Sequence, residues 1–400
     1  MSRTVSVVLI DRGGALRGVL DPFEVEVPWW PEVGEIVATV RQRHGLEITV
    51  LRLLTTDRPA QPGGAVSYLA EADAGQVYPA GLPLPDLDLA PHPLRAAYAE
   101  PGGPAVSLAW ASDTLSRIGW GAPTVVNQRK TWNLSALWRL QCPAGVVWLK
   151  QTPGFFFPES TVLTWLAQTL PGVAPQLLAA DRHGRTLLAE APGQDRFGAP
   201  AVEREPMAQR LHEVQLQALT KLDHLAGLGV PDWREDRLVE LAEEIADRHG
   251  AGIRGLPELL RALPGRLARI RDCGVPDTLV HSDFHPGNVR TVDGPDPALT
   301  ILDWGEVFLG HPGLDILRLT GDLAPAARQP LLREWSRRWA LAAPGCDPDR
   351  ALTLLPPVEA LRGAVVYGTF LANIEPSEHP YHAQDVPDCL RRAVELAGVA

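Results

Sequence analysis

The chain has 400 residues, and this length favours about two or three domains over a single hydrophobic core. Apolar residues make up 45% of the chain and charged residues 21%, which is typical of a packed globular protein and excludes a disordered or fibrous one. Lys and Arg number 37 against 48 Asp and Glu, so the net charge is -11 and the chain lacks the basic surplus that nucleic-acid binding requires.

The four cysteines, at positions 142, 273, 346 and 389, are far apart and show no spacing typical of zinc ligands or of a disulfide framework. Near the N-terminus the apolar run is only six residues long, and nowhere do eighteen apolar residues follow one another. We therefore expect reduced thiols, no signal peptide, no membrane span and a cytoplasmic location.

The first hundred residues predict a small α+β domain. Short apolar runs from "VSVVLID" to "GAVSYLAEAD" read as strands, and "EVGEIVATVRQRHG" between them reads as a helix. Prolines then accumulate from Pro79 to Pro104 and end in "EPGGP", which is typical of a linker. This pattern predicts a first domain over residues 1–100.

Residues 101–192 predict a second, β-rich domain. After a helix around "SDTLSRIG", the stretch "QRKTWNLSALWRLQCPAGVVWLKQT" reads as three strands joined by tight turns. The segment "PESTVLTWLAQTL" reads as a helix, and "PQLLAAD" and "RTLLAEA" read as two further strands. From residue 193 to 400 amphipathic helical patterns prevail, which predicts a third, mainly helical domain.

One β-rich island interrupts these helices and contains "HSDFHPGNV", residues 281–289. Apolar runs on both sides of "DGPDP" predict a hairpin whose turn falls at Pro295 and Asp296. Asn288 and Asp303 are equally far from this turn, so we expect them to face one another at the open end, with Asp283 on the loop just before. Two carboxylates and one amide oxygen are ligands that suit magnesium better than zinc.

Two alternatives accompany this interpretation. Asp283 is also suited to capping a turn, and Asn288 and Asp303 to satisfying loop amides, although the spacing of the three favours a functional role. The two histidines of the motif, His281 and His285, are also suited to binding a transition metal together with Asp283.

The island resembles a known family. His281-x-Asp283 followed by Asn288 resembles the H-R-D-x-x-x-x-N loop of protein kinases, and "LDWG" at 302–305 stands where those enzymes have D-F-G. The form "HSDFHPGN" with "DWG" is similar to the aminoglycoside phosphotransferase and choline kinase branch, over residues 120–395. The resemblance implies an α+β fold with two protein-kinase-like lobes, one small and β-rich and one larger and helical, preceded here by the small α+β domain.

The resemblance also implies roles for residues of the island. Asp283 would be the catalytic base, His281 would orient the loop, and Asp315 in "GHPGLDILRL" would brace it. Asn288 and Asp303 would hold Mg²⁺ on the β- and γ-phosphates of ATP.

In the β-rich domain, Lys150 ends a strand and Glu159 begins the next helix, in the order of the kinase lysine–glutamate ion pair that contacts the α- and β-phosphates. A solvated edge lysine and a glutamate that only favours the helix dipole are the alternatives. The loop "KTWNLSAL" lacks glycine, but Asn133 and Ser135 offer backbone N–H groups and a hydroxyl to phosphate. The kinase plan places adenine at the backbone of Glu190 and Ala191.

The acceptor would be a small molecule with a hydroxyl group. Glu375, Glu378 and Asp385, in the polar stretch "NIEPSEHPYHAQDVP", would read a cationic acceptor, and a solvated acidic connection is the alternative.

The first domain resembles a Nudix domain in its strands around one helix. Aligned on Gly45, the Nudix-box Arg and three Glu are replaced by Ala38, Thr39, Gln42 and Arg43. Without these carboxylates a Nudix-type hydrolase is disfavoured. The remaining interpretations are a non-hydrolytic, regulatory Nudix-like domain or a surface that forms a homodimer.

The sequence thus predicts an ATP-dependent kinase of small molecules. A catalytically silent, nucleotide-binding module of the same fold is the alternative; the glycine-free loop favours it, and the retained Lys150, Asp283, Asn288 and Asp303 argue against it.

Overall fold

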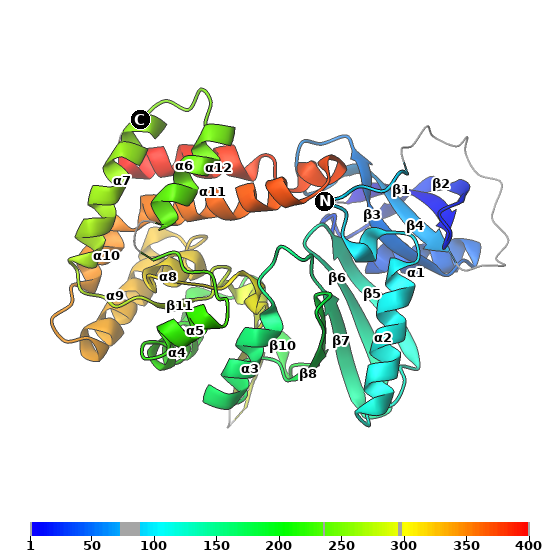
Figure 1. Ribbon diagram of the computed structural model, residues 1–400, viewed down its shortest axis with the longest axis horizontal. Helices are drawn as coiled ribbons and strands as arrows, with labels where there is room; N and C mark the ends of the chain where they lie inside the picture. The colour runs from blue at the N-terminus through cyan, green and yellow to red at the C-terminus, as the bar shows by residue number, and fades with distance from the viewer. Residues whose placement is uncertain (1, 73–88, 235–236, 295–297, 399–400) are drawn as a thin grey trace. The chain divides into compact units, whose positions relative to one another are not determined.

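The computed structural model describes residues 2–72, 89–234, 237–294 and 298–398 (Figure 1). Contacts between residues divide the chain into two compact units. The first contains residues 1–155, 177–190 and 369–384, and the second contains 156–176, 191–368 and 385–400. These two units do not coincide with the predicted domain boundaries near residues 100 and 192. Those boundaries remain a prediction about which parts of the chain fold independently.

The first unit begins with a four-stranded sheet in the order β2-β1-β4-β3, in which β1 and β4 are parallel and the other pairs antiparallel. Its elements are β1 (Arg3–Asp11), β2 (Leu16–Val25), α1 (Gly34–His44), β3 (Ile48–Thr56) and β4 (Gly64–Ala72). Helix α1 ends at Gly45, whose φ of 66° is a left-handed conformation that glycine adopts without cost. The predicted strands around one helix are therefore confirmed.

The second sheet of this unit is antiparallel, in the order β5-β6-β7-β9-β8. Its elements are η1 (Ala97–Ala99), α2 (Gly103–Arg117), β5 (Val125–Trp132), β6 (Ser135–Cys142), β7 (Gly145–Gln151), β8 (Leu177–Ala180) and β9 (Arg185–Ala189). Figure 1 shows α2 alongside β5, β6 and β7. Ala111 and Leu115 of α2 share a buried core with Trp138, Leu140 and Leu149.

The stretch "EPGGP" differs from its prediction as a linker, because it starts α2. Gly102 precedes the helix with φ 76°, and Pro104 lies in the first turn, where its missing N–H costs nothing. A Cβ on Gly103 would lie 1.9 Å from the carbonyl oxygen of Ala97, so only glycine allows this close approach. Glycine and proline here therefore mark a tight helix start.

The two sheets of the first unit are joined by the side chain of Gln128 on β5. Its amide donates to the carbonyl oxygen of Val50 at 2.7 Å and accepts from the Val50 N–H at 2.8 Å, in the manner of a neighbouring strand. The Thr131 hydroxyl also donates to the carbonyl oxygen of Leu51, at 3.2 Å. Gln128 is buried, so these hydrogen bonds are shielded from water.

The second unit is mainly helical, as predicted, and its β structure is confined to short strands. It contains α3 (Glu159–Thr169), β10 (Gln194–Asp195), α4 (Ala201–Ala218), α5 (Leu222–Gly227), α6 (Arg237–His249), α7 (Leu256–Arg271), β11 (Thr278–Val280), η2 (Pro286–Asn288), β12 (Val289–Val292), β13 (Ala298–Ile301), η3 (Trp304–Glu306), β14 (Phe308–Gly310), α8 (Gly313–Leu319), α9 (Pro325–Ala342), α10 (Pro348–Leu354) and α12 (Asp385–Ala397). Helix α11 (Pro356–Asn373) begins in this unit, and η4 (Pro376–Tyr381) lies in the first. Among the described residues, no helix combines the length and apolar character that crossing a membrane requires.

The hydrogen bonds of Gln128 lead to a stability prediction. Gln128→Ala leaves the buried N–H and C=O groups of Val50 without these partners, so we expect the free energy of unfolding to fall by about 2–4 kcal/mol. Urea unfolding of the full chain measures this change. Gln141→Ala, at an exposed position of β6, is the matched control. A loss for Gln128→Ala no larger than that of the control would contradict the role of this amide.

Candidate active site

The predicted hairpin is formed by β12 and β13. Val289 pairs with Ile301, and the Leu302 N–H donates to the carbonyl oxygen of Asn288 at 2.8 Å. Asn288 therefore lies opposite Leu302, and Asp303 follows one residue beyond, where a φ of 60° ends the strand. The hairpin prediction is confirmed with this shift of one residue, and the predicted turn at Pro295 and Asp296 lies outside the described residues.

The loop that follows β11 is held by Asp315 from α8. Its buried carboxylate accepts from the backbone N–H of His281 and of Ser282, both at 3.0 Å, and from the side chain of Gln215, also at 3.0 Å. Ser282 has a φ of 76°, which non-glycine residues rarely adopt, and its hydroxyl accepts from Arg362 at 3.0 Å. Asp315 thus has the bracing contacts that the sequence predicted.

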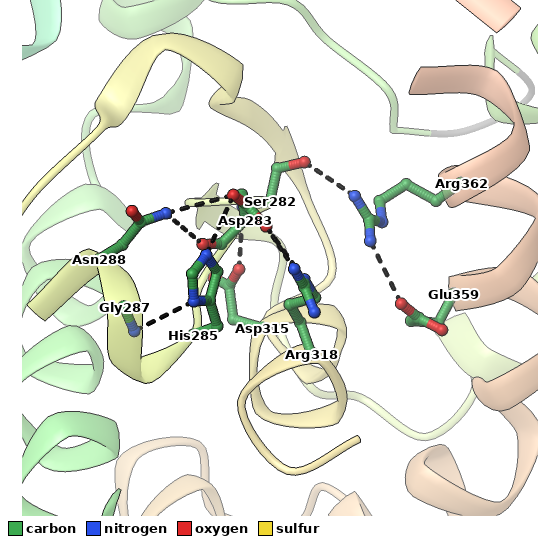
Figure 2. A network of polar contacts seen from close by, with 9 residues as sticks. All are labelled: Ser282, Asp283, His285, Gly287, Asn288, Asp315, Arg318, Glu359 and Arg362. Atoms are coloured by element: carbon green, nitrogen blue, oxygen red, sulfur yellow. Dashed lines mark hydrogen bonds and ion pairs between the residues drawn. The ribbon is translucent and has the colours of Figure 1, made fainter. Parts of the chain in front are cut away.

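Asp283 projects from this loop with partners on both carboxylate oxygens (Figure 2). Its Oδ1 accepts from Nε and Nη2 of Arg318 at 3.0 and 2.8 Å. Its Oδ2 accepts from Nδ2 of Asn288 at 3.2 Å and lies 3.4 Å from Nε2 of His285. Burial raises the pKa of Asp283, but contacts with His285 and Arg318 outweigh burial and hold the pKa well below its usual range. The carboxylate is therefore ionised and oriented.

The two histidines of the loop have different environments. His281 is buried, its Nε2 lies 2.8 Å from the carbonyl oxygen of Leu302, and burial lowers its pKa. Nδ1 of His285 accepts from the Gly287 N–H at 3.0 Å, which assigns the proton of the neutral ring to Nε2, beside Asp283. Both rings therefore make orienting contacts. Among the described residues no three His, Cys, Asp or Glu side chains gather as metal ligands.

The donor set at the open end of the hairpin fits Mg²⁺. Asn288 donates through Nδ2, and Figure 2 shows its oxygen on the side of the amide away from Asp283. Burial, together with the charges of Asp283 and Asp303, raises the pKa of Glu306 to about 8, so Glu306 is mostly neutral at pH 7 and the two aspartates carry the negative charge here. Mg²⁺ is commonly held by one or two protein oxygens, with water and phosphate completing its coordination. The sequence patterns did not indicate Glu306, three residues after Asp303, or Arg318.

Lys150 and Glu159 lie in different units, so their predicted ion pair remains a prediction. Lys150 is a half-buried residue of β7, paired with Leu137 in the sheet. Glu159 is the first residue of α3 and is buried, and its Oε1 accepts from the Trp304 N–H at 2.8 Å. The sequence placed Glu159 correctly at the helix start but did not indicate this bond to the D-W-G segment.

Several groups of the β-rich sheet that the sequence predicts to contact the nucleotide already have hydrogen-bond partners within the protein. The Asn133 side chain is buried and bonded within the first unit, and the Ser135 hydroxyl accepts from the Trp132 indole at 3.1 Å. The Glu190 N–H donates to the carbonyl oxygen of Val146 at 3.0 Å, which leaves its carbonyl as the group for adenine. Ala191 is buried. Contacts of these four residues with ATP remain predictions.

The predicted acidic acceptor site requires a correction. Glu375 is buried in the first unit, where it accepts from Arg95 at 2.9 Å and lies 3.4 Å from Arg52. Glu378 is also buried there, and burial and the charge of Glu375 raise its pKa to about 8. These two carboxylates are therefore part of a core and do not line a cleft for a cation. Asp385 is the first residue of α12, which belongs to the second unit.

The site lies within a part of the chain that matches a known protein family. The model of the phosphotransferase enzyme family, APH, matches residues 149–351, just over half of the chain, including the loop of Asp283 and the hairpin. The chain belongs to this family. A search of curated proteins found no match.

Solved structures of a phosphotransferase and a kinase share the fold. A candidate aminoglycoside phosphotransferase from Ralstonia eutropha JMP134 is 18% identical, with a TM-score of 0.52, over 74% of this chain and 98% of that chain. The choline kinase LicA from Streptococcus pneumoniae is 13% identical, with a TM-score of 0.52, over 72% of this chain and 98% of that chain. This phosphotransferase-family chain thus has a protein-kinase-like fold with a β-sheet lobe and a helical lobe, preceded by a small β-rich part.

The environment of Glu378 predicts a pH dependence of stability. Because folding raises its pKa from the usual 4.5 to about 8, the folded chain binds this proton more tightly, so the contribution to stability is complete below pH 4.5 and is lost as pH rises towards 8. Urea unfolding between pH 5 and pH 8.5 should show wild type losing about 4 kcal/mol more than Glu378→Gln, at about 1.4 kcal/mol for each pKa unit. Parallel pH profiles of the two proteins would show that Glu378 does not titrate this way.

Proposed function

We propose that this protein is an ATP-dependent kinase that transfers the γ-phosphoryl group to a hydroxyl of a small molecule. The observation that carries the proposal is the oriented, ionised Asp283 beside Asn288 and Asp303 at the open end of one hairpin. Membership of the phosphotransferase enzyme family supports the reaction class. The identity of the acceptor does not follow from the fold.

In the proposed reaction the acceptor oxygen attacks the γ-phosphorus, the bond to the bridging oxygen breaks, ADP leaves, and the hydroxyl proton passes to Asp283. Arg318 and His285 fix the carboxylate that receives this proton. Asn288 and Asp303 would hold Mg²⁺, which neutralises charge on the β- and γ-phosphates. Lys150 would contact the α- and β-phosphates, and the backbone at Glu190 and Ala191 would hold adenine.

The catalytically silent alternative is not favoured, because the chain keeps a carboxylate where a base is needed and bonds on both its oxygens. For residues 1–100, the Nudix resemblance remains an interpretation without a supporting match. Since the Nudix-box carboxylates are replaced, we propose that this part does not hydrolyse nucleotides.

The proposed base leads to a direct test. Asp283→Asn keeps the size of the side chain but removes its basicity, so we expect phosphorylation of acceptors to fall by about a thousandfold while Mg-ATP still binds. Radiolabelled ATP with pooled hydroxylated metabolites and aminoglycosides measures transfer, and calorimetry measures ATP binding.

Asp293→Asn, at an exposed position after β12, is the matched control and should retain full activity. Turnover of Asp283→Asn at the rate of this control would rule out Asp283 as the base. Binding of ATP without transfer to any acceptor by wild type would instead support the silent module.

A further inference from the structure

The turn between β5 and β6 is buried and contains no glycine. Trp132 pairs with Ser135, so Asn133 and Leu134 form a two-residue turn, and their exposed fractions are only 3% and 5%. Among the described residues, Ser282 and Asp303 are the only non-glycines with positive φ, so both turn residues have negative φ. Two-residue hairpin turns prefer positive φ at their first position, which fits the twist of the strands. Strand twist therefore does not favour this turn, and contacts from outside the hairpin hold it in place.

Those contacts come from the segment Pro376–His382, far away in the sequence but in the same unit. Nε2 of His382 lies 3.2 Å from Oδ1 of Asn133, and Nδ2 of Asn133 donates to the carbonyl oxygen of Glu378 at 3.5 Å. Because Oδ1 can only accept, the His382 ring donates through Nε2. His382 is 3% exposed, so this bond is protected from water.

Aromatic packing holds the start of the turn as well. The Trp132 ring lies edge-on to Tyr381 at 5.7 Å and is tilted against His382 at 5.5 Å between ring centroids. The carbonyl oxygen of Trp132 accepts from the Tyr98 hydroxyl at 2.8 Å. Tyr381 also belongs to the core of the first sheet, where it meets Trp30 edge-on at 5.7 Å. The turn, residues 376–382 and the N-terminal sheet therefore form one packed body.

We propose that the segment Pro376–His382 positions the β5–β6 turn for Mg-ATP, with His382 and Asn133 as the positioning residues. The proposal rests on the proposed ATP-dependent kinase, in whose plan this turn covers the phosphates. A glycine-rich loop is ordered when nucleotide binds, and this ordering costs conformational entropy. A turn that is already fixed by His382 avoids that cost, so its fixation contributes to ATP affinity.

This assignment gives the segment 373–387 a different role from the one that its acidic residues suggested. Its side chains define a nucleotide loop instead of reading a cationic acceptor. The N-terminal sheet then has a structural role in nucleotide binding, because its core holds Tyr381 in place.

The test is calorimetric titration of Mg-ATP into the full chain. His382→Ala removes the donor to Asn133 and should weaken ATP binding by about five- to tenfold, because the released turn must then be ordered when ATP binds. Asn133→Ala should weaken it by a similar factor. His382→Gln keeps an N–H donor and should restore most of the affinity. Asn373→Ala, at a half-buried position whose side chain donates to the carbonyl oxygen of Thr369 in the same helix, is the control and should bind as wild type does.

A purely structural role predicts a different pattern, namely a lower melting temperature for His382→Ala with unchanged ATP affinity. That pattern, or a His382→Gln variant as weak as His382→Ala, would overturn the positioning role and leave the proposed kinase intact. If wild type itself fails to bind Mg-ATP, the proposed function fails and the positioning role fails with it.

Discussion

The buried carboxylate of Asp315 is the interaction on which the geometry of the site depends. It accepts from two consecutive backbone N–H groups, of His281 and Ser282, and so holds Ser282 in a left-handed conformation that its own side chain does not favour. That conformation directs the next residue, Asp283, towards Arg318 and Asn288. Removal of the Asp315 carboxylate would leave these buried N–H groups without partners. The conformation of the loop therefore depends on helix α8.

The sequence was sufficient to predict the strands around α1, the second sheet and the β12–β13 hairpin, because these follow from local patterns. Alternating apolar residues predicted the five strands of β5 to β9, and the turn residues after Asn288 predicted the hairpin. The error of one residue at Asp303 arises because a left-handed residue ends the strand early, which strand periodicity does not encode.

Other features depend on contacts between residues far apart in the sequence. Glu375 and Glu378 look like a polar surface in the sequence, yet Arg52 and Arg95 lie beside Glu375 in a buried core. Arg318 reaches Asp283 from a different helix, 35 residues away, and no local pattern indicates that pair. When a charged residue is buried by partners far away in the sequence, local composition does not show that it is buried. Composition alone therefore does not identify the residues of a binding site.

We propose that Asn288 and Asp303 hold the metal–nucleotide complex at the open end of the hairpin. The most direct measurement is calorimetric ATP affinity with Mg²⁺ and with a chelator, in wild type and in Asp303→Asn. We expect Mg²⁺ to strengthen ATP binding to wild type and to have little effect on the variant, because the variant lacks the charged ligand. The same Mg²⁺-dependent gain in both proteins would contradict the claim.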